Sequence, residues 1–341
     1  MQKIIKKTKF GTFPRIPSAL KNNFSTEKKG SAQNGDITDR ARVVIIGGGV
    51  IGTSVAYHLA KLGWSKEGIL LLEQEKLTSG TTWHAAGLVE TFGSFSETST
   101  EFRKYTRELY ATLEQETGLS TGWRQCGFIE LAATRDYYQQ FQRIAAFNRR
   151  HGVEVEEISA AEVKILFPLC NTEDLFAGFY VPKDGRANPV DCTMSLAKGA
   201  RMGGAKLLEG VRVKEVVSRK GKVEGVMLED GRLVECEYVV NCAGMWARQL
   251  GAKNGVIIPN QAAEHYYLIT EKIAEVDPSW PVIEDPSSFS YVRPEGDGLM
   301  IGLFEPHAAA WSVREVPPNF SFGSLPPDWE RMTPFLDKGS F

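Results

Sequence analysis

Two short apolar runs and the segment between them predict the first structural unit of the chain. Arg42–Ile46 is continuous and β-branched, which is typical of a strand buried on both faces. After a glycine-rich turn, Thr53–Leu62 carries small and apolar residues at helical spacing and ends at Gly63. A second apolar run, Ile69–Leu72, ends at Glu73. The pattern therefore predicts a strand–turn–helix–strand unit of a parallel sheet.

The glycine-rich turn predicts a dinucleotide site. Gly47 allows a tight turn, Gly49 lets the backbone approach a pyrophosphate, and Gly52 lets the helix pack closely on the strand. The free N–H groups at the start of the helix attract phosphate. Glu73 follows Gly52 at the distance where a carboxylate binds ribose hydroxyls.

The segment after Glu73 favours FAD over NAD. Thr78–Leu88 is a polar loop with glycines that opens into small residues, whereas an NAD domain continues with another strand and helix. A flavin needs such a loop, because its ribityl chain and ring lie alongside backbone.

Later segments predict the remaining elements of the flavin-binding unit. We expect a helix at Cys192–Met202 and a strand at Lys206–Leu208. A three-stranded meander should follow at Val211–Val217, Val223–Glu229 and Arg232–Val240, and a small-residue turn at Asn241–Ala247. This order differs from that of a nicotinamide dehydrogenase.

Composition narrows the class of protein. The formal net charge is −2, so the sequence predicts no binding to nucleic acid. The 5 cysteines are scattered, which favours buried thiols over disulfides or a zinc site. No run approaches the ~18 apolar residues of a membrane helix, so we expect no membrane insertion.

The N-terminus predicts a mitochondrial protein. Residues 1–26 contain 6 basic residues and no acidic residue, with serine, threonine and phenylalanine among them. This composition is typical of a transit peptide, and the alternative is a basic tail without a targeting role. Residues 27–40 are polar and predict a linker.

These segments together resemble the sarcosine and dimethylglycine dehydrogenase family, within the D-amino-acid-oxidase-like flavoproteins. The matching text is GGGVIGTSVAYHLAKLG, LTSGTTWHAAGL, LEQETGLSTGW, YVPKDGRANP, VVNCAGMWA, EHYYLIT and SYVRPEGDGLMIG, and the resemblance extends from Arg42 to nearly the C-terminus. It implies FAD bonded covalently to the histidine of TTWHAAG, which is His84 here. A neutral imidazole is nucleophilic near neutral pH, which suits that role.

The resemblance implies an α/β fold with two interleaved domains. A Rossmann-like FAD-binding domain of the glutathione-reductase or D-amino-acid-oxidase type is expected at residues 41–93 and 184–255, and an antiparallel-sheet substrate domain at 94–183 and 256–322. Residues 1–40 form the transit peptide and linker, and 323–341 a truncated C-terminal segment. The expected cofactor residues are Gly47, Gly49, Val50, Ile51, Gly52, Glu73, Gln74, Ser79, Gly80, Thr81, Thr82, Trp83, His84, Ala85, Ala86, Gly87, Leu88, Val213, Gly244 and Trp246.

The expected reaction is oxidative N-demethylation of a methylated glycine, and the sequence does not separate sarcosine from dimethylglycine. His265 is expected as base, Tyr291 as hydrogen-bonding substrate contact, and Arg293 as carboxylate anchor. Strand period places His265 with Tyr267 on one face, and Phe289 with Tyr291 and Arg293 on another. The resemblance further implies electron-transfer flavoprotein as electron acceptor and the mitochondrial matrix as location.

The chain departs from the family at its C-terminus. We expect the last flavin-covering loops and the folate-binding region to be missing, so that the chain is a fragment or needs a partner. The main alternative is a regulatory protein without catalysis, because the run around His265 also resembles the regulatory subunit of pyruvate dehydrogenase phosphatase. That relative lacks the flavin-linking Trp-His pair, so Trp83 and His84 favour an enzyme.

Overall fold

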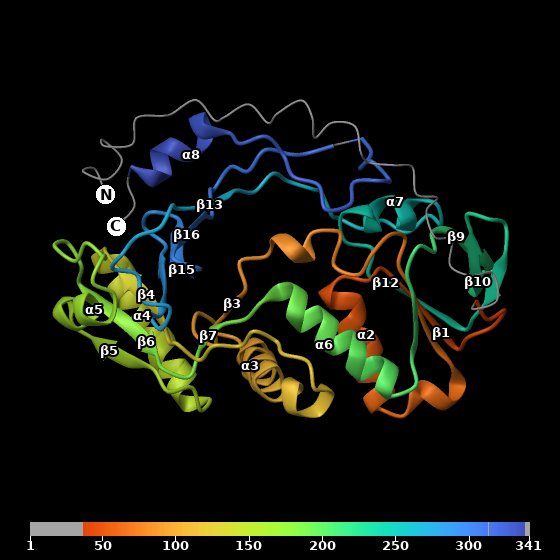
Figure 1. Cartoon of the computed structure of the whole chain (residues 1–341), viewed down its shortest axis with the longest axis horizontal. Helices are drawn as coiled ribbons and strands as arrows, with labels where there is room; N and C mark the ends of the chain where they lie inside the picture. The colour runs from red at the N-terminus through yellow and green to blue at the C-terminus, as the bar shows by residue number, and fades with distance from the viewer. Residues whose placement is uncertain (1–36, 313, 338–341) are drawn as a thin grey trace.

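The computed structural model describes residues 37–312 and 314–337. Nearly all of the predicted transit peptide and linker therefore lie outside the described residues. Two sheets lie at opposite ends of the molecule, joined by the helices between them (Figure 1). Among the described residues, no helix has the combination of length and apolar character needed to cross a membrane.

The first sheet contains the predicted nucleotide-binding unit. Its strands are β1 (Val43–Ile46), β2 (Ile69–Leu72), β8 (Lys206–Leu208) and β12 (Tyr238–Asn241), arranged in the order β12-β1-β2-β8 and all parallel. The residues of β1 and β2 are all buried, as continuous apolar strands covered on both faces must be. The predicted strand–turn–helix–strand order is confirmed.

Helices cover one face of this sheet. These helices are α2 (Val50–Lys61), α6 (Pro189–Met202) and, beneath α6, α3 (Glu97–Thr117). Asn188 caps α6 at its N-terminus by accepting the N–H groups of Val190 and Asp191. A core that includes Leu71, Leu113 and Leu196 fills the space between helices and sheet.

The other face is covered by a separate antiparallel sheet of β9 (Val213–Arg219), β10 (Lys222–Leu228) and β11 (Leu233–Glu235). The prediction of one strand at Arg232–Val240 is wrong, because the chain breaks there into β11 and β12. β11 pairs with β10, whereas β12 pairs with β1 in the parallel sheet. Cys236 lies between the two strands and is buried in the core that separates the two sheets.

The second large sheet has seven strands, in the order β13-β16-β15-β14-β4-β6-β5. Its strands come from two distant segments: β4 (Phe128–Ala132), β5 (Glu156–Ile158) and β6 (Ala177–Val181) from the first, and β13 (Tyr267–Ile269), β14 (Val282–Asp285), β15 (Ser290–Glu295) and β16 (Gly298–Leu303) from the second. The segments meet where β4 pairs with β14 in parallel, and the other pairs are antiparallel.

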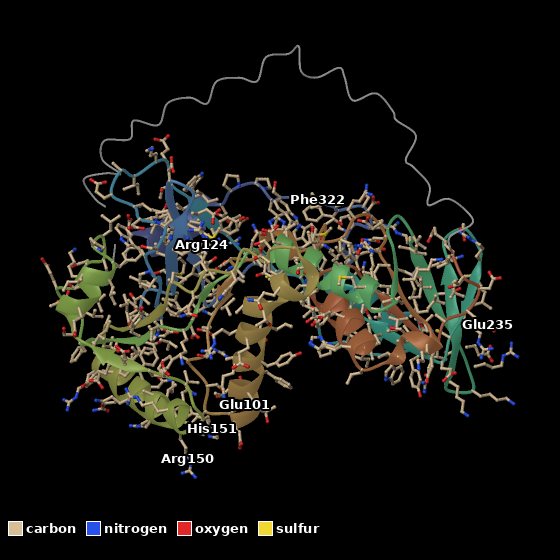
Figure 2. All side chains as sticks on the ribbon, turned by 60° about the horizontal axis from the view of Figure 1, so that its bottom comes forward. Glu101, Arg124, Arg150, His151, Glu235 and Phe322 are labelled. Atoms are coloured by element: carbon tan, nitrogen blue, oxygen red, sulfur yellow. The ribbon has the colours of Figure 1, made fainter. Side chains whose placement is uncertain are left out.

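Helices α4 (Arg135–Arg150) and α5 (Ala160–Leu166) pack on this sheet from opposite sides. α5 begins with a capping box, in which Ser159 and Glu162 accept each other's backbone N–H groups. The end of α4 is tied to α3 by Lys104, which donates to the Glu101 carboxylate at 2.9 Å and to the His151 carbonyl at 3.0 Å. Figure 2 shows Glu101 and His151 side by side.

The remaining elements are short and lie between or beside the helices and sheets described above. They are the short pair β3 (Leu88–Val89) and β7 (Gly185–Arg186), the one-turn helices η2 (Trp64–Glu67), η3 (Thr82–His84) and η4 (Gly244–Trp246), and the helices α7 (Ala247–Ala252) and α8 (Trp329–Leu336). The segment between β16 and α8 crosses from the seven-stranded sheet to the parallel sheet and back (Figure 1). It therefore lies over the region between the parallel sheet and the seven-stranded sheet.

Candidate functional site

The turn from β1 into α2 has the backbone geometry that the glycine pattern predicts. Gly47 has φ +113°, a conformation that strongly favours glycine. A side chain at Gly47 would overlap the carbonyl of Cys242, and one at Gly52 would overlap the carbonyl of Gly47. These contacts hold the start of α2 close to the carboxyl ends of β1 and β12.

The N-terminus of α2 suits an anion. Gly49 is its N-cap and supplies no side-chain hydrogen bond, and the first turn contains no acidic residue. The Thr82 hydroxyl approaches from the loop after β2 and accepts the Val50 N–H at 3.0 Å. A side chain at Gly49 would crowd that hydroxyl. With the Val50 N–H bound by Thr82, the N–H groups of Ile51 and Gly52 in the first turn suit a ligand's phosphate.

Glu73 lies at the end of β2, beside this turn. Its buried carboxylate accepts the N–H of Gly48 at 2.6 Å and the N–H of Glu75 at 2.9 Å. Burial raises the pKa of Glu73, and the two backbone hydrogen bonds partly offset that rise. The bonds fix the carboxylate in one orientation, with acceptor positions left for ribose hydroxyls.

These groups line one cleft of about 430 Å³, a volume within the usual range of ligand sites. Twelve of the predicted cofactor residues contribute to its wall: Gly47, Gly49, Val50, Ile51, Glu73, Gln74, Gly80, Thr81, Thr82, Val213, Gly244 and Trp246. The cleft also has basic side chains that the sequence reasoning missed, Arg212, Lys214 and Lys253. Arg212 and Lys214 lie at the start of β9 and Lys253 directly after α7, so their spacing in the sequence does not indicate a shared site.

The segment after β16 closes the cleft from above. The Trp246 indole N–H donates to the Pro317 carbonyl at 3.0 Å, and the Gln249 amide donates to the Val316 carbonyl at 3.3 Å. The Phe322 N–H donates to the Ser79 carbonyl at 2.8 Å. Figure 2 shows Phe322 where this segment passes over the helices.

His84 lies just beyond the wall of the cleft, at the end of η3. Its imidazole is partly buried, and the centroid of the Trp83 ring lies 3.7 Å from that of the imidazole. His84 Nε2 lies 2.9 Å from the Gly323 carbonyl. Burial lowers the pKa of His84, so the neutral imidazole predominates near neutral pH. A neutral imidazole nitrogen is a nucleophile.

The loop that follows His84 leads from the cleft to the seven-stranded sheet. Gly87 has φ +73°, and its carbonyl accepts the Ala187 N–H at 2.8 Å. Leu88 then pairs with β7, while Ala85 is exposed. The Ala86 carbonyl accepts the Arg293 Nε–H at 2.8 Å. Residues Trp83 to Leu88 therefore lie between the cleft and the sheet.

Arg293 is buried, and two of its three guanidinium nitrogens donate hydrogen bonds within the protein. Its Nη1 donates to the Pro294 carbonyl at 3.0 Å and to the Glu295 carboxylate, besides the bond from Nε to Ala86. Among the described residues, Nη2 has no partner. The carboxylate-anchor role expected of Arg293 is therefore limited to this one nitrogen, and the rest of the guanidinium ties β15 to the His84 loop.

The predicted residues His265 and Tyr291 share one neighbourhood. Tyr291 is 1% exposed, and its ring crosses the Cα of Gly302, where any side chain would overlap it. The Phe304 ring lies 5.2 Å from the Tyr291 ring and 6.0 Å from the His265 ring. Phe304 was missed by sequence reasoning.

One expectation about strand faces is corrected, and a second stays a prediction. Phe289 lies in the turn before β15 and has φ +55°, so strand alternation does not place it with Tyr291 and Arg293. His265 precedes β13, which begins at Tyr267, so the alternation of side chains within a strand does not test whether these two residues share a face.

A buried acidic cluster adjoins Tyr291 on the same sheet. Glu284 on β14 lies opposite Tyr291 on β15 and opposite Glu130 on β4. Carboxylate oxygens of Glu90, Glu130 and Glu284 all lie within 4.8 Å of one another. The Arg103 guanidinium pairs with Glu90. Burial, followed by the neighbouring carboxylates, raises the pKa of Glu130 well above its usual value, and the pKa of Glu284 rises to about 7.

A helix that begins at a glycine-rich turn, a buried carboxylate beside that turn and a long loop towards a second sheet are typical parts of a flavin-binding oxidoreductase. A family model described as FAD dependent oxidoreductase matches residues 42–340. The chain belongs to this family.

Curated relatives agree. Human mitochondrial sarcosine dehydrogenase is 38% identical over 324 residues, which cover 93% of this chain and 34% of that protein. Rat mitochondrial dimethylglycine dehydrogenase is 36% identical over 307 residues, covering 88% and 35%. The mouse mitochondrial regulatory subunit of pyruvate dehydrogenase phosphatase is 38% identical over 300 residues, covering 87% and 34%. The chain thus spans about a third of the length of these relatives.

A solved structure supports the fold. The crystal structure of L-proline dehydrogenase from P. horikoshii superposes with a TM-score of 0.77 at 25% identity, covering 89% of this chain and 78% of that one. The predicted α/β fold of the D-amino-acid-oxidase type is confirmed.

The acidic cluster generates a prediction about stability. Because the pKa of Glu130 is raised in the folded state, the stability associated with its proton is present at low pH and is lost as pH rises above the unfolded-state pKa. Glu130→Gln retains the neutral form at every pH. We expect it to stabilise the protein near pH 7.5 by about 1–3 kcal/mol, since each pH unit contributes about 1.4 kcal/mol.

Thermal unfolding between pH 4.5 and 8 measures this effect. The gain in Tm should shrink towards pH 4.5, and the exposed control Glu173→Gln should follow the parent protein. A gain that is independent of pH, or a loss at pH 7.5, would contradict the assignment.

Proposed function

We propose that this chain forms the flavin-binding part of an amine dehydrogenase that demethylates a small N-methylated amino acid. The observation that carries the proposal is the continuity of the site. One short loop contacts both parts of the site. Thr82 binds the N-terminus of α2, and the neutral His84 follows two residues later. Ala86 then accepts a hydrogen bond from Arg293, on the strand that also carries Tyr291. A flavin extended along this path has its phosphates at α2 and its ring between His84 and the seven-stranded sheet.

The residues of the cleft fit FAD. Gly47 and Gly52 allow the close backbone packing that brings the start of α2 to the strand ends, and Gly49 lines the cleft without a side chain. Glu73 offers fixed acceptors to a ribose. His84 would hold the ring covalently through its imidazole. FAD, when bound, supplies the acceptor for the hydride that leaves the substrate's N-methyl carbon.

The side chains on the sheet bind and deprotonate the substrate. An ammonium group has no lone pair to assist hydride loss, so the amine proton must leave first, and His265 accepts it. The Tyr291 hydroxyl donates a hydrogen bond to the substrate, and Arg293 Nη2 binds its carboxylate. Hydride loss gives an iminium ion, and water then releases formaldehyde and the demethylated amine.

The proposal includes a substrate class, an electron acceptor and a location. Sarcosine and dimethylglycine are the candidate substrates, electron-transfer flavoprotein is the acceptor, and the mitochondrial matrix is the location. The similar human and rat enzymes, mitochondrial dehydrogenases of sarcosine and dimethylglycine, support these substrates and a mitochondrial location. Overall identity does not separate this function from a regulatory one, because the regulatory subunit is as similar as sarcosine dehydrogenase.

The attachment through His84 has a direct test. Flavin fluorescence should remain with the acid-denatured polypeptide of the full chain on a gel and should disappear in His84→Ala. The matched control His151→Ala removes a histidine at the far end of α4 and should retain the fluorescence. Flavin that acid releases from the parent protein would contradict covalent attachment.

Activity is tested by anaerobic reduction. Addition of sarcosine or dimethylglycine to the flavin-loaded full chain should bleach the flavin absorbance and yield formaldehyde, whereas glycine, which has no N-methyl group, should do neither. Loaded protein that neither substrate bleaches would refute the enzymatic proposal and favour the regulatory alternative.

A further inference from the structure

A buried carboxylate lies beside His265. Glu305 follows β16, and its side chain is only 4% exposed. Its Oε2 is buried and accepts no hydrogen bond from the described residues. A carboxylate oxygen that is removed from water without a partner is costly, typically by more than 1 kcal/mol. The position therefore requires a donor.

His265 Nδ1 is placed to be that donor. It lies 3.6 Å from Glu305 Oε2, and the His265 side chain is 48% exposed. The separation exceeds a hydrogen bond by about half an ångström, a movement that a side chain on an open surface makes readily. The His265 ring lies nearly parallel to that of Phe304, at 24° between planes, and this contact limits its rotation.

The other charged groups near His265 are already paired with one another. The adjacent Glu264 carboxylate accepts from the Arg331 guanidinium at 3.1 Å and from the Tyr266 hydroxyl at 2.9 Å. Arg331 also pairs with Asp328 at 3.0 Å. On the side of Phe304, Tyr291 contributes a buried phenol whose pKa burial raises to about 12, so it remains neutral. Glu305 is thus the carboxylate that faces the imidazole.

We propose that Glu305 is a positioning residue that accepts the Nδ1 proton of His265 and thereby directs Nε2 towards the substrate amine. The two ring nitrogens lie on opposite sides of the imidazole, so a proton held on Nδ1 leaves the lone pair on Nε2. When Nε2 takes the amine proton, the buried carboxylate stabilises the imidazolium ion that forms. The inference rests on the proposed function only for the identity of the proton donor.

The tautomer of His265 tests the pairing without any turnover. The chain has 5 histidines, so long-range ¹H–¹⁵N spectra of the full chain can be assigned with His265→Asn. In the neutral ring we expect the proton on Nδ1. Glu305→Leu removes the acceptor, and the proton should move to Nε2, the form that water favours. Glu305→Gln offers an amide oxygen and should keep the proton on Nδ1.

Unchanged signals from His58, His84 and His151 show that the variants fold. A parent protein with the His265 proton on Nε2 would overturn the proposal, even if Glu305→Leu does not fold. An unchanged tautomer in folded Glu305→Leu would overturn it as well. The exposed control Asp297→Asn, in the turn between β15 and β16, should leave the His265 signals in place.

Kinetics of the flavin-loaded chain give the second readout. Glu305→Leu should slow anaerobic flavin reduction about 10- to 100-fold, a part of what a general base contributes, with little change in the substrate's apparent Kd. Glu305→Gln should recover part of the rate. If the parent protein is not reduced by N-methyl amino acids, the proposed function fails, whereas the tautomer experiment still decides the role of Glu305.

Discussion

The arrangement of the site depends on the contact between Thr82 and the first turn of α2. The Thr82 hydroxyl accepts the Val50 N–H at 3.0 Å, and the absence of a side chain at Gly49 leaves room for it. This bond fixes the loop after β2 against the N-terminus of α2, the proposed phosphate site. Because His84 follows two residues later in the same one-turn helix, a single short segment sets the position of the imidazole relative to that helix end.

A second constraint relates the other sheet to that segment. Arg293 reaches from β15 to the Ala86 carbonyl, and Gly302 lets the Tyr291 ring cross its neighbouring strand towards Phe304. The hydrogen bond from Arg293 therefore fixes the position of the His84 loop relative to the aromatic side chains of the sheet. In the proposed function, a flavin ring attached at His84 faces these aromatic side chains. Glu315, Val316 and Pro318 line the cleft from the segment after β16.

The sequence predicted the parts of the site that are local. The glycine turn, Glu73 and the loop to His84 all lie within one stretch in which each residue has a backbone task, so spacing alone carries the information. The break at Cys236 was not predictable in this way, because the two halves of an apolar run pair with different sheets. Only the tertiary structure decides between such pairings.

The residues around His265 show the same limit. A strand pattern at Glu264–Thr270 predicts alternating faces, but the paired strand β13 begins only at Tyr267. Phe304 and Glu305 approach His265 because β16 pairs with β13, which no local pattern records. The sequence predicts Arg293 as a carboxylate anchor, whereas its hydrogen bond to the Ala86 carbonyl follows only from the tertiary structure.

In the proposed function, one loop carries the flavin from α2 to the seven-stranded sheet. A crystal structure of the flavin-loaded full chain would show this path. We expect the pyrophosphate at the N-terminus of α2, continuous density from His84 to the flavin ring, and the ring facing Tyr291 and His265. A flavin whose ring lies away from the His84 loop, or whose phosphates do not contact α2, would refute the proposal.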